Sequence, residues 1–307
     1  MGVTVLIAGP TASGKSGIAL DLAERLGGTV INADSMQVYS GLHIITARPD
    51  AAAQARARHR LYGVLPPDDP CSAARWAMLA QGEIKAAHAA GQVAIVVGGT
   101  GLYFHALTDG LADIPQIPPK IRGDLMAWLA RDGAPALHAE LARLDPDLAA
   151  RLEPGDGQRI LRGLEVIQGT GRPLSAWQAD PTTAPPADLG TVVRLVVAPE
   201  RATLLPRIRS RLEIMARTGA VEEAQAFMAL DLDPTLPASK AIGLKAFAAL
   251  GSGQIDLATA LERAEIETRQ YAKRQMTWVR GRMGDWPPWG AQETVRIFAE
   301  LEQKMRQ

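Results

Sequence analysis

The chain has 307 residues, of which 47% are hydrophobic and 21% are charged, a composition typical of a globular protein with a sizeable core. Its 33 basic and 33 acidic residues give a formal net charge of zero, so a surface for nucleic acid would have to arise from local clusters of charge. The single Cys71 excludes a disulfide framework and a cysteine-built zinc site, and no apolar run reaches the roughly 18 residues of a membrane span, so we expect a cytoplasmic protein that contacts no membrane.

The first predicted elements are a strand, a glycine-rich turn and a helix. The apolar run Val3–Ala8 predicts a buried strand, and residues 17–26 carry apolar side chains at helical spacing. Between them, residues 9–16 read GPTASGKS and fit the pattern G-x-x-x-x-G-K-[ST] of a phosphate-binding loop. In such a loop backbone N–H groups and the helix N-terminus converge on phosphate oxygens, Lys15 holds the outer phosphate, and Ser16 binds Mg²⁺. The sequence therefore predicts binding of a diphosphate or polyphosphate.

The next elements alternate between strands and helices. Residues 29–33 predict a second buried strand, residues 51–60 a helix, residues 72–90 a helix capped by its serine, and residues 93–97 a third buried strand. Strands that alternate with helices of this length indicate a parallel sheet.

Two polar residues follow the ends of these strands. Asp34 follows the second strand and Thr100 the third, and ligands of open α/β sheets bind at that edge. If the first two strands are neighbours, Asp34 lies beside the phosphate loop. Asp34 is either a general base or a group that supports the metal, or it is a turn-forming or helix-capping residue. Thr100 either contacts a substrate or caps the following helix. The third strand also lacks the terminal Asp that helps to hold Mg²⁺ in many nucleotide hydrolases.

Two proline-rich stretches, residues 113–119 and 181–186, enclose a region with helical patterning, and strand patterning returns at residues 191–197. We therefore expect an α/β fold with a P-loop NTPase-like parallel sheet core and an inserted helical subdomain. The expected core comprises residues 1–117 and 190–307, and the expected helical insertion domain comprises residues 118–189.

Basic residues form local clusters despite the zero net charge. Arg207 and Arg211 are four residues apart and share a helix face, which either binds phosphate or is a solvated face with glutamate partners. Near the C-terminus, Tyr271, Gln275 and Trp278 interleave with basic residues at helical spacing. These three side chains either support RNA binding or form a stripe of the core.

Seven motifs, in the same order and over nearly the whole chain, resemble the tRNA dimethylallyltransferase family, also called the IPP transferase family. They are GPTASGKS at residues 9–16, ADSMQVY at 33–39, TARP at 46–49, HRL at 59–61, VGGTGLY at 97–103, QRILR at 158–162 and KRQMTW at 273–278.

The resemblance implies transfer of a dimethylallyl group from dimethylallyl diphosphate to the exocyclic amine of the adenine 3′ of the anticodon, in tRNAs that read codons beginning with U. The expected partners are therefore dimethylallyl diphosphate and the tRNA anticodon stem-loop, the expected cofactor is Mg²⁺ bound by Ser16, and we expect a monomer. Because no phosphoryl group is transferred, this reaction also explains why the third strand lacks the usual carboxylate.

The resemblance implies that Asp34, Lys15, Arg211 and Thr100 are catalytic residues. Asp34 is expected to be the general base, Thr100 to contact the substrate tRNA, and Lys15 and Arg211 to neutralise charge on the departing diphosphate. The diphosphate is expected to contact Arg211 and the loop residues Gly9, Pro10, Thr11, Ala12, Ser13, Gly14, Lys15 and Ser16. The expected tRNA contacts are Asp34, Ser35, Met36, Gln37, Thr100, Arg122, Gln158, Arg159, Ile160, Leu161, Arg162, Lys240, Ala241, Ile242, Gly243, Leu244 and Lys245, with residues 118–189 forming an insertion domain that contacts tRNA.

The chain departs from the commoner family pattern at two places. Ile45 stands where a glycine usually precedes Thr46, and Lys240 and Lys245 lie in a segment where arginine is frequent, which keeps the charge but not the bidentate geometry.

Three rival functions share parts of the pattern. A small-molecule kinase shares the phosphate loop but needs a carboxylate on or near the third strand. An isopentenyltransferase acting on free adenosine nucleotides does not need the basic insert or residues 273–282. A non-catalytic RNA-binding module gives no role to Asp34 or to Mg²⁺.

Overall fold

The computed structural model describes residues 2–180 and 187–288. The predicted proline stretch at residues 181–186 and residues 289–307 of the predicted core lie outside the described residues. The chain divides into two compact units, one formed by Met1–Thr108 with Ala187–Gln307 and the other by Asp109–Pro186. The phosphate-loop motif lies in the first of these units.

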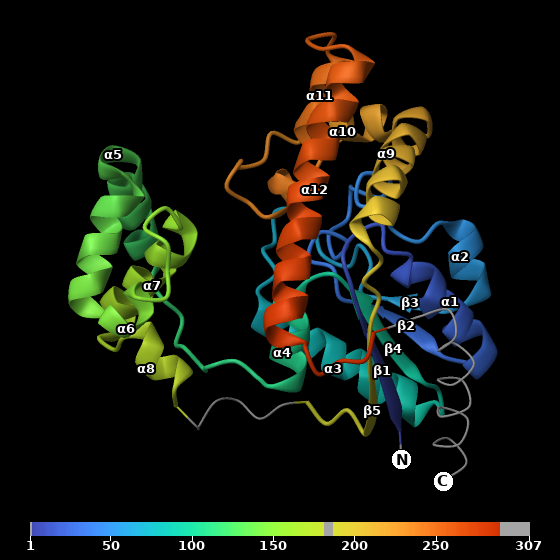
Figure 1. Cartoon of the computed structure of the whole chain (residues 1–307), viewed down its shortest axis with the longest axis horizontal. Coiled ribbons are helices and arrows are strands. Elements are labelled where there is room, and N and C mark those ends of the chain that lie inside the picture. The colour runs from blue at the N-terminus through green and yellow to red at the C-terminus, as the bar shows by residue number, and fades with distance from the viewer. Residues whose placement is uncertain (1, 181–186, 289–307) are drawn as a thin grey trace. The chain divides into compact units, whose positions relative to one another are not determined.

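The larger unit is built around a parallel sheet, which confirms the predicted α/β fold. Within the described residues the sheet has five strands in the order β3-β2-β4-β1-β5 (Figure 1). In the register of the sheet, Thr4 of β1 lies opposite Ala94 of β4 on one side and opposite Val192 of β5 on the other. The strands are β1 (Val3–Ala8), β2 (Thr29–Asn32), β3 (Arg58–Arg60), β4 (Ala94–Gly98) and β5 (Thr191–Val196).

Asp34 was predicted to lie beside the phosphate loop on the condition that the first two strands are neighbours in the sheet. The structure shows that they are not neighbours, so this condition is wrong. β4 lies between β1 and β2 and pairs with both of them. The C-terminal ends of β1, β4 and β2 nevertheless share one edge, because the strands run in parallel. That edge carries the phosphate loop, Thr100 and Asp34 in this order.

The predicted helix at residues 51–60 is also wrong at its C-terminal end. α2 covers only Ala51–Arg56, and Ala57 has an extended backbone with φ −149° and ψ 157°. Residues 58–60 then form β3, whose two arginines are exposed while His59 between them is half-buried. Pairing with β2 gives this edge segment its backbone hydrogen bonds, and this tertiary contact overrides the local helical pattern.

The sheet is covered by apolar side chains on both faces. On one face, Val5 and Ile7 pack with Leu22 of α1 (Lys15–Leu26). On the other face, Leu6 packs in a cluster that includes Trp76 and Phe104, and the helices there are α3 (Ala73–Ala89) and α4 (Gly101–Thr108). Burying apolar surface stabilises the fold by roughly 25 cal/mol per Å². Because both faces of the sheet are buried in this way, polar groups of the site are found at the ends of the strands.

A group of helices forms a further core cluster beside the loop that follows β2. Tyr39 and Leu42 from that loop are buried in this cluster together with residues of the four helices α9 to α12, whose bounds are given below. α12 is the longest of these and packs against α9, α11 and α4 (Figure 1). The helices are α9 (Arg201–Arg217), α10 (Ala220–Met228), α11 (Leu244–Gly251) and α12 (Leu257–Arg282), and a short 3-10 helix spans Ala238–Lys240.

The smaller unit is helical and has its own core, which includes Leu137, Leu141, Ile160 and Leu164. Gly133, with φ 78°, interrupts the first helix of this unit. The helices are α5 (Pro119–Leu144), α6 (Pro146–Ala149), α7 (Gly157–Thr170) and α8 (Leu174–Gln178). In neither unit does a helix of the described residues combine the length and the apolar character that a membrane crossing needs.

Candidate functional site

The phosphate loop, residues 9–16, connects β1 directly to α1. Gly14 and Ala12 have positive φ angles of 93° and 61°, so the loop turns tightly before the helix begins at Lys15. A Cβ atom on Gly9 would lie 2.3 Å from the carbonyl oxygen of Val197. The loop is therefore packed closely against the chain that follows β5, and this arrangement requires glycine at position 9.

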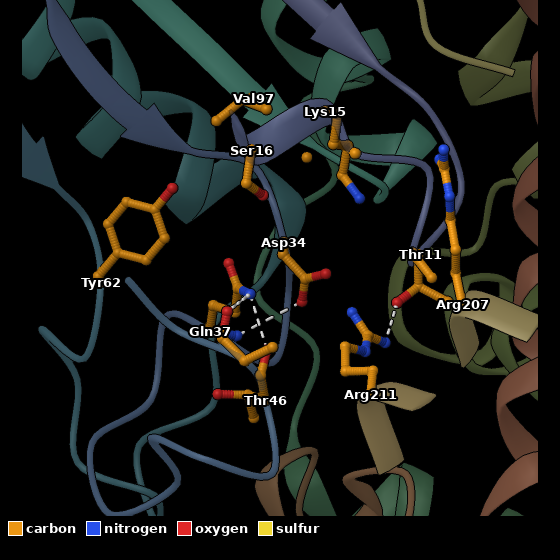
Figure 2. Close-up of a pocket in the computed structure, with 14 residues that line it drawn as sticks. Thr11, Lys15, Ser16, Asp34, Gln37, Thr46, Tyr62, Val97, Arg207 and Arg211 are labelled. Carbon is orange, nitrogen blue, oxygen red and sulfur yellow. Dashed lines mark hydrogen bonds between the residues drawn. The ribbon is translucent and has the colours of Figure 1, made fainter. Parts of the chain in front are cut away.

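The loop forms one wall of a cavity of about 360 Å³ at the C-terminal edge of the sheet (Figure 2). The cavity brings Lys15, Asp34 and Arg211 together from three separate parts of the sequence. Its lining residues are Thr11, Ala12, Gly14, Lys15, Ser16, Asp34, Gln37, Thr46, Ala47, Tyr62, Val97, Gly98, Arg207 and Arg211.

Lys15 supplies a cation at the start of α1. Its Nζ donates a hydrogen bond to the carbonyl oxygen of Pro10 at 3.1 Å. Burial lowers the pKa of Lys15 to about 8, while the negative charge of Asp34 opposes this shift and Arg211 adds to it. Lys15 is therefore mostly protonated at neutral pH and loses its proton more readily than an ordinary lysine.

Two arginines of α9 reach the phosphate loop. Arg211 donates a hydrogen bond to Thr11 Oγ1, and Arg207 donates one to the carbonyl oxygen of Ser13 at 3.3 Å. Burial lowers the pKa of Arg211, and the charge of Asp34 opposes that shift. The shared helix face of the two arginines was predicted from the sequence, but Arg207 was not among the predicted site residues. The spacing of four residues between Arg207 and Arg211 is the sequence signal from which Arg207 could have been predicted as a site residue.

Asp34 occupies a fixed turn after β2. The buried Asn32 accepts a hydrogen bond from Asp34 N at 2.8 Å and donates one to its carbonyl oxygen at 3.0 Å. Asp34 Oδ1 in turn accepts from Met36 N at 2.9 Å. The carboxylate therefore stabilises the turn and also lines the cavity that contains Lys15 and Arg211. The structure thus shows the turn-forming contacts of Asp34, and its role as a general base stays a prediction.

Thr100 lies beside the Asp34 turn. Its Oγ1 accepts a hydrogen bond from Ser35 N at 3.0 Å, and its carbonyl oxygen accepts from Tyr103 N at the start of α4. Burial raises the pKa of the Tyr271 hydroxyl, and the nearby side chains of Thr100 and Ser35 oppose this rise. Thr100 is not among the described residues that line the cavity. Tyr271 was treated in the sequence only as part of a stripe, so its contact with this turn was not predicted.

The Asp34 loop, residues 34–47, is held by two polar side chains. Gln37 Nε2 donates to the carbonyl oxygens of Thr46 and Ala47 at 2.7 and 3.0 Å. Glu223 of α10 accepts hydrogen bonds from three consecutive backbone N–H groups, those of residues 43–45, at 2.7 to 2.8 Å. The positive φ of 55° in this loop falls on Ala47 and not on Ile45, so Ile45 does not occupy a backbone conformation that favours glycine.

The expected tRNA contacts of the smaller unit differ in exposure. Ile160 and Leu161 are buried in the core of that unit, with 0% and 4% of their surface exposed. Gln158, Arg159 and Arg162 are exposed on the same helix. Arg162 and Arg122 both pair with the buried Glu165, at 3.0 and 3.4 Å. Of the predicted run, only the exposed side chains are therefore accessible to a partner without rearrangement of this core.

The expected contacts at residues 240–245 are divided in the same way. Ala241 and Leu244 are buried in the helical cluster, and Gly243 N donates to Glu267 Oε2 at 3.0 Å. Lys240 and Lys245 are exposed. The two lysines are thus the charged groups that this segment presents to solvent.

A glycine-rich phosphate loop on a parallel sheet, facing a carboxylate and two guanidinium groups, defines a phosphate-binding α/β protein of the P-loop class. The family model described as IPP transferase matches residues 37–282, and the model described as isopentenyl transferase matches residues 2–65. The chain belongs to the IPP transferase family.

Curated relatives agree with this assignment. The chain is 53% identical over 276 residues to a tRNA dimethylallyltransferase of Rhodospirillum centenum, which covers 90% of this chain and 88% of that protein. It is 49% identical over 301 residues to one of Parvibaculum lavamentivorans, covering 98% of this chain and 95% of that protein.

Solved structures also resemble this chain. The full-length tRNA isopentenylpyrophosphate transferase of Bacillus halodurans has a TM-score of 0.67 and 31% identity, covering 100% of this chain and 97% of that one. A eukaryotic dimethylallyltransferase acting on tRNA has a TM-score of 0.74 and 27% identity, covering 91% of this chain and 70% of that one.

Proposed function

We propose that this chain transfers a dimethylallyl group from dimethylallyl diphosphate to the exocyclic amine of the adenine 3′ of the anticodon, in tRNAs that read codons beginning with U. Membership of the IPP transferase family and relatives named tRNA dimethylallyltransferase support this function. The single observation that carries it is the cavity in which Asp34 lies with Lys15 and Arg211 beside the phosphate loop. A carboxylate and two cations suit a reaction that removes a proton and releases a diphosphate.

The phosphate loop holds the diphosphate of the donor. The start of α1 lies at this site, with Lys15 and Arg211 among the residues that line it. The unpaired N–H groups of a helix N-terminus favour a phosphate at such a position. When the bond between C1 and the diphosphate oxygen breaks, negative charge develops on the diphosphate. Lys15 and Arg211 neutralise this charge from positions that are fixed before the reaction, through the contacts with Pro10 and Thr11. Arg207 adds a further positive group at the mouth of the loop.

Asp34 takes the proton from the acceptor. The adenine amine attacks C1 of the dimethylallyl group, an N–C bond forms as the C–O bond breaks, and the amine proton passes to the Asp34 carboxylate. The hydrogen bond from Met36 N orients this carboxylate. Because the adenine amine is inside the stacked anticodon loop in free tRNA, the base has to leave its stack to reach Asp34.

Mg²⁺ is the cofactor that the family implies, and the residues of the cavity fit it. No group of three His, Cys, Asp or Glu side chains in the described part of the chain is arranged to hold a metal. Magnesium commonly keeps several waters and binds phosphate oxygens with one or two protein groups, so a site built from the Ser16 hydroxyl and the diphosphate is sufficient. When bound there, the ion neutralises charge on the departing diphosphate.

The helical insertion domain, residues 118–189, is the part that we assign to tRNA contact. Arg122, Arg159 and Arg162 are exposed on it, and arginine is well suited to phosphate. Lys240 and Lys245 provide further cations on the larger unit. We also propose that the chain acts as a monomer.

The function is tested by incubating the protein with radiolabelled dimethylallyl diphosphate, Mg²⁺ and either tRNA or AMP. We expect label in tRNA, and in digests of that tRNA we expect it on the adenine 3′ of the anticodon. Label in AMP but not in tRNA would instead identify an enzyme of free nucleotides. ATP turnover without prenyl transfer would identify a small-molecule kinase, and tRNA binding with neither reaction would identify a non-catalytic module.

A further inference from the structure

One face of α12 contacts both the phosphate loop and the Asp34 loop. Gln275 Oε1 accepts a hydrogen bond from Thr11 N at 2.8 Å. One helical turn earlier, the side chains of Thr100 and Ser35 lie close enough to the Tyr271 hydroxyl to lower its pKa against the effect of burial. The stripe that the sequence left open is therefore packed inside the larger unit, and it joins the two loops on which the proposed reaction depends.

The contact at Gln275 is close. Only 5% of Gln275 is exposed, and a Cβ atom on Gly99 would lie 1.9 Å from its Nε2 atom. A Cβ atom on Gly101 would likewise lie 2.0 Å from the ring of Trp278. The two glycines after β4 thus allow α12 to approach the phosphate loop.

Gln275 is buried at a cost that packing alone does not explain. Within the described residues its Nε2 has no hydrogen-bond partner, so the bond from Thr11 N is the polar contact that the side chain makes there. An apolar side chain of the same length would fill the same space without burying an unpartnered amide. A role that depends on the Oε1 acceptor accounts for the presence of glutamine.

Thr11 forms hydrogen bonds to residues of both α12 and α9. Its backbone N–H donates to Gln275, and its Oγ1 accepts from the Arg211 guanidinium, the contact drawn in Figure 2. Among the described residues the Nε of Arg211 has no partner, so the hydrogen bond to Thr11 is a principal restraint on this group. Gln275, Thr11 and Arg211, which are far apart in the sequence, thus form a chain of hydrogen bonds, here called the relay. It runs from α12 through the phosphate loop to the Arg211 guanidinium in the cavity.

We propose that Gln275 is a positioning residue, which fixes the Thr11 peptide and thereby holds the Arg211 guanidinium where the departing diphosphate lies. This inference rests on the proposed function. Gln275 is not among the described residues that line the cavity, so it acts through Thr11 and Arg211 and not on the reacting atoms.

The first test replaces Gln275 with methionine, which keeps the length of the side chain and removes the acceptor. Gln270→Met is the matched control, because Gln270 is an exposed glutamine on the same helix. Transfer is measured at steady state over a range of tRNA concentrations, which gives kcat and the KM for tRNA. Because a small misplacement of a group that stabilises the transition state has a large effect on rate, we expect kcat to fall about 10- to 100-fold in Gln275→Met. We expect the KM for tRNA to change less than twofold and the control to behave as wild type. An unchanged kcat overturns the proposal.

The second test asks whether Gln275 acts through Arg211. If it does, Gln275→Met loses most of its effect in an Arg211→Ala background, and the double variant is less than about twofold slower than Arg211→Ala alone. A merely structural role for Gln275 gives losses that multiply, and this result overturns the relay.

A third measurement does not depend on prenyl transfer or on the folding of one variant. Isothermal titration with inorganic diphosphate should show affinity reduced severalfold in Gln275→Met, and similarly in Thr11→Val, which removes the acceptor for Arg211. If Gln275→Met does not fold, as judged by thermal melting, Thr11→Val carries the test, and wild-type affinity in that variant refutes the relay. Failure of the wild-type protein to prenylate tRNA counts against the proposed function, whereas the diphosphate titration still decides the role of Gln275.

Discussion

The phosphate loop and the Asp34 loop face each other across one cavity, but they are stabilised in different ways. The phosphate loop is compact in sequence, since its turn, its Lys15 and the helix behind it lie within residues 9–26. The Asp34 loop depends on distant residues, because Glu223 is 180 residues away from His43 and Thr100 is 65 residues away from Ser35. The turn and the lysine of the phosphate loop, which face the donor, are therefore encoded locally, and Gln275 and Arg211 are added to them from distant parts of the chain. The Asp34 loop, which faces the acceptor, depends on the tertiary fold for its main supports.

This difference separates two kinds of substitution. Changes on the donor side should alter charge at the diphosphate and leave the fold largely intact. Changes to the supports of the Asp34 loop should reduce stability as well as activity.

The largest effect is expected from Asp34→Asn. The amide oxygen can still accept the hydrogen bond from Met36 N, so the turn is kept while the base is lost. We expect turnover to fall about 10²- to 10⁴-fold with little change in tRNA affinity. Transfer assays and tRNA-binding titrations check this result, with the exposed Asp68→Asn as the control. A matching loss of tRNA affinity would instead make Asp34 a recognition residue.

Lys15→Met should weaken diphosphate binding by about 10- to 100-fold, because a hydrogen bond to a charged group contributes about 1.5–3 kcal/mol. Titration with inorganic diphosphate measures the effect, and the exposed Lys85→Met is the control. An affinity equal to that of wild type would remove Lys15 from the diphosphate site.

The lowered pKa of Lys15 also gives the site a pH dependence. Since Lys15 loses its proton near pH 8 in the free protein, the ratio of wild-type to Lys15→Met diphosphate affinity should decrease as pH rises above 8. The contribution of Lys15 to the stability of the free protein changes with pH in the opposite direction to its contribution to diphosphate affinity. Between about pH 8 and the unfolded lysine value of 10.5 the unfolded chain binds more protons, so this lysine's contribution to the free energy of unfolding rises with pH. Urea denaturation of wild type and Lys15→Met at pH 7.5 and pH 9.5, values chosen to lie on either side of about 8, tests this sign.

On the acceptor side, Glu223→Gln should lower the free energy of unfolding by about 1–3 kcal/mol, because three backbone N–H groups lose a charged acceptor. Denaturant unfolding measures the change. Glu222→Gln is the matched control, since Glu222 is exposed in the same first turn of α10. Equal stability of the two variants would show that the Asp34 loop does not depend on α10.

The smallest effect concerns the smaller unit. Arg159→Gln removes one exposed cation, so tRNA affinity should fall a fewfold and the slope of log Kd against log salt should decrease by about 1. Binding titrations at several salt concentrations check this slope. A slope identical to that of wild type would place Arg159 outside the tRNA interface.

Sequence alone predicted the features that are encoded within one short segment. The motif at residues 9–16, the strand before it and the capped helix after Ser72 are each defined by neighbouring residues, and the structure has all three. The edge strand β3 was not predicted, because three residues carry too little periodicity to outweigh the helical pattern before them. Strand order also could not be predicted, and β4 separates β1 from β2.

The missed site residues share a physical reason. Glu223 and Gln275 act on backbone N–H groups of segments more than 170 residues away. Their residue types are ordinary for a helix. The helical spacing of Gln275 with Tyr271 and Trp278 is visible in the sequence, but such a local pattern does not identify the distant segment that a side chain contacts. Arg207 is different, because its spacing from Arg211 was visible and only its contact with Ser13 was not.

The pairing of β1 with β5 has a consequence for how the protein is made. Val3–Ala8 is synthesised first, yet its partner Thr191–Val196 follows the smaller unit in the chain. At about 5–20 residues per second, the ribosome needs roughly 5–20 s to pass from β4 to the end of β5. During that interval one edge of β1 is unpaired and Gly9 lacks its packing against Val197. The nascent chain therefore completes its phosphate loop late, after the smaller unit has had time to fold on its own.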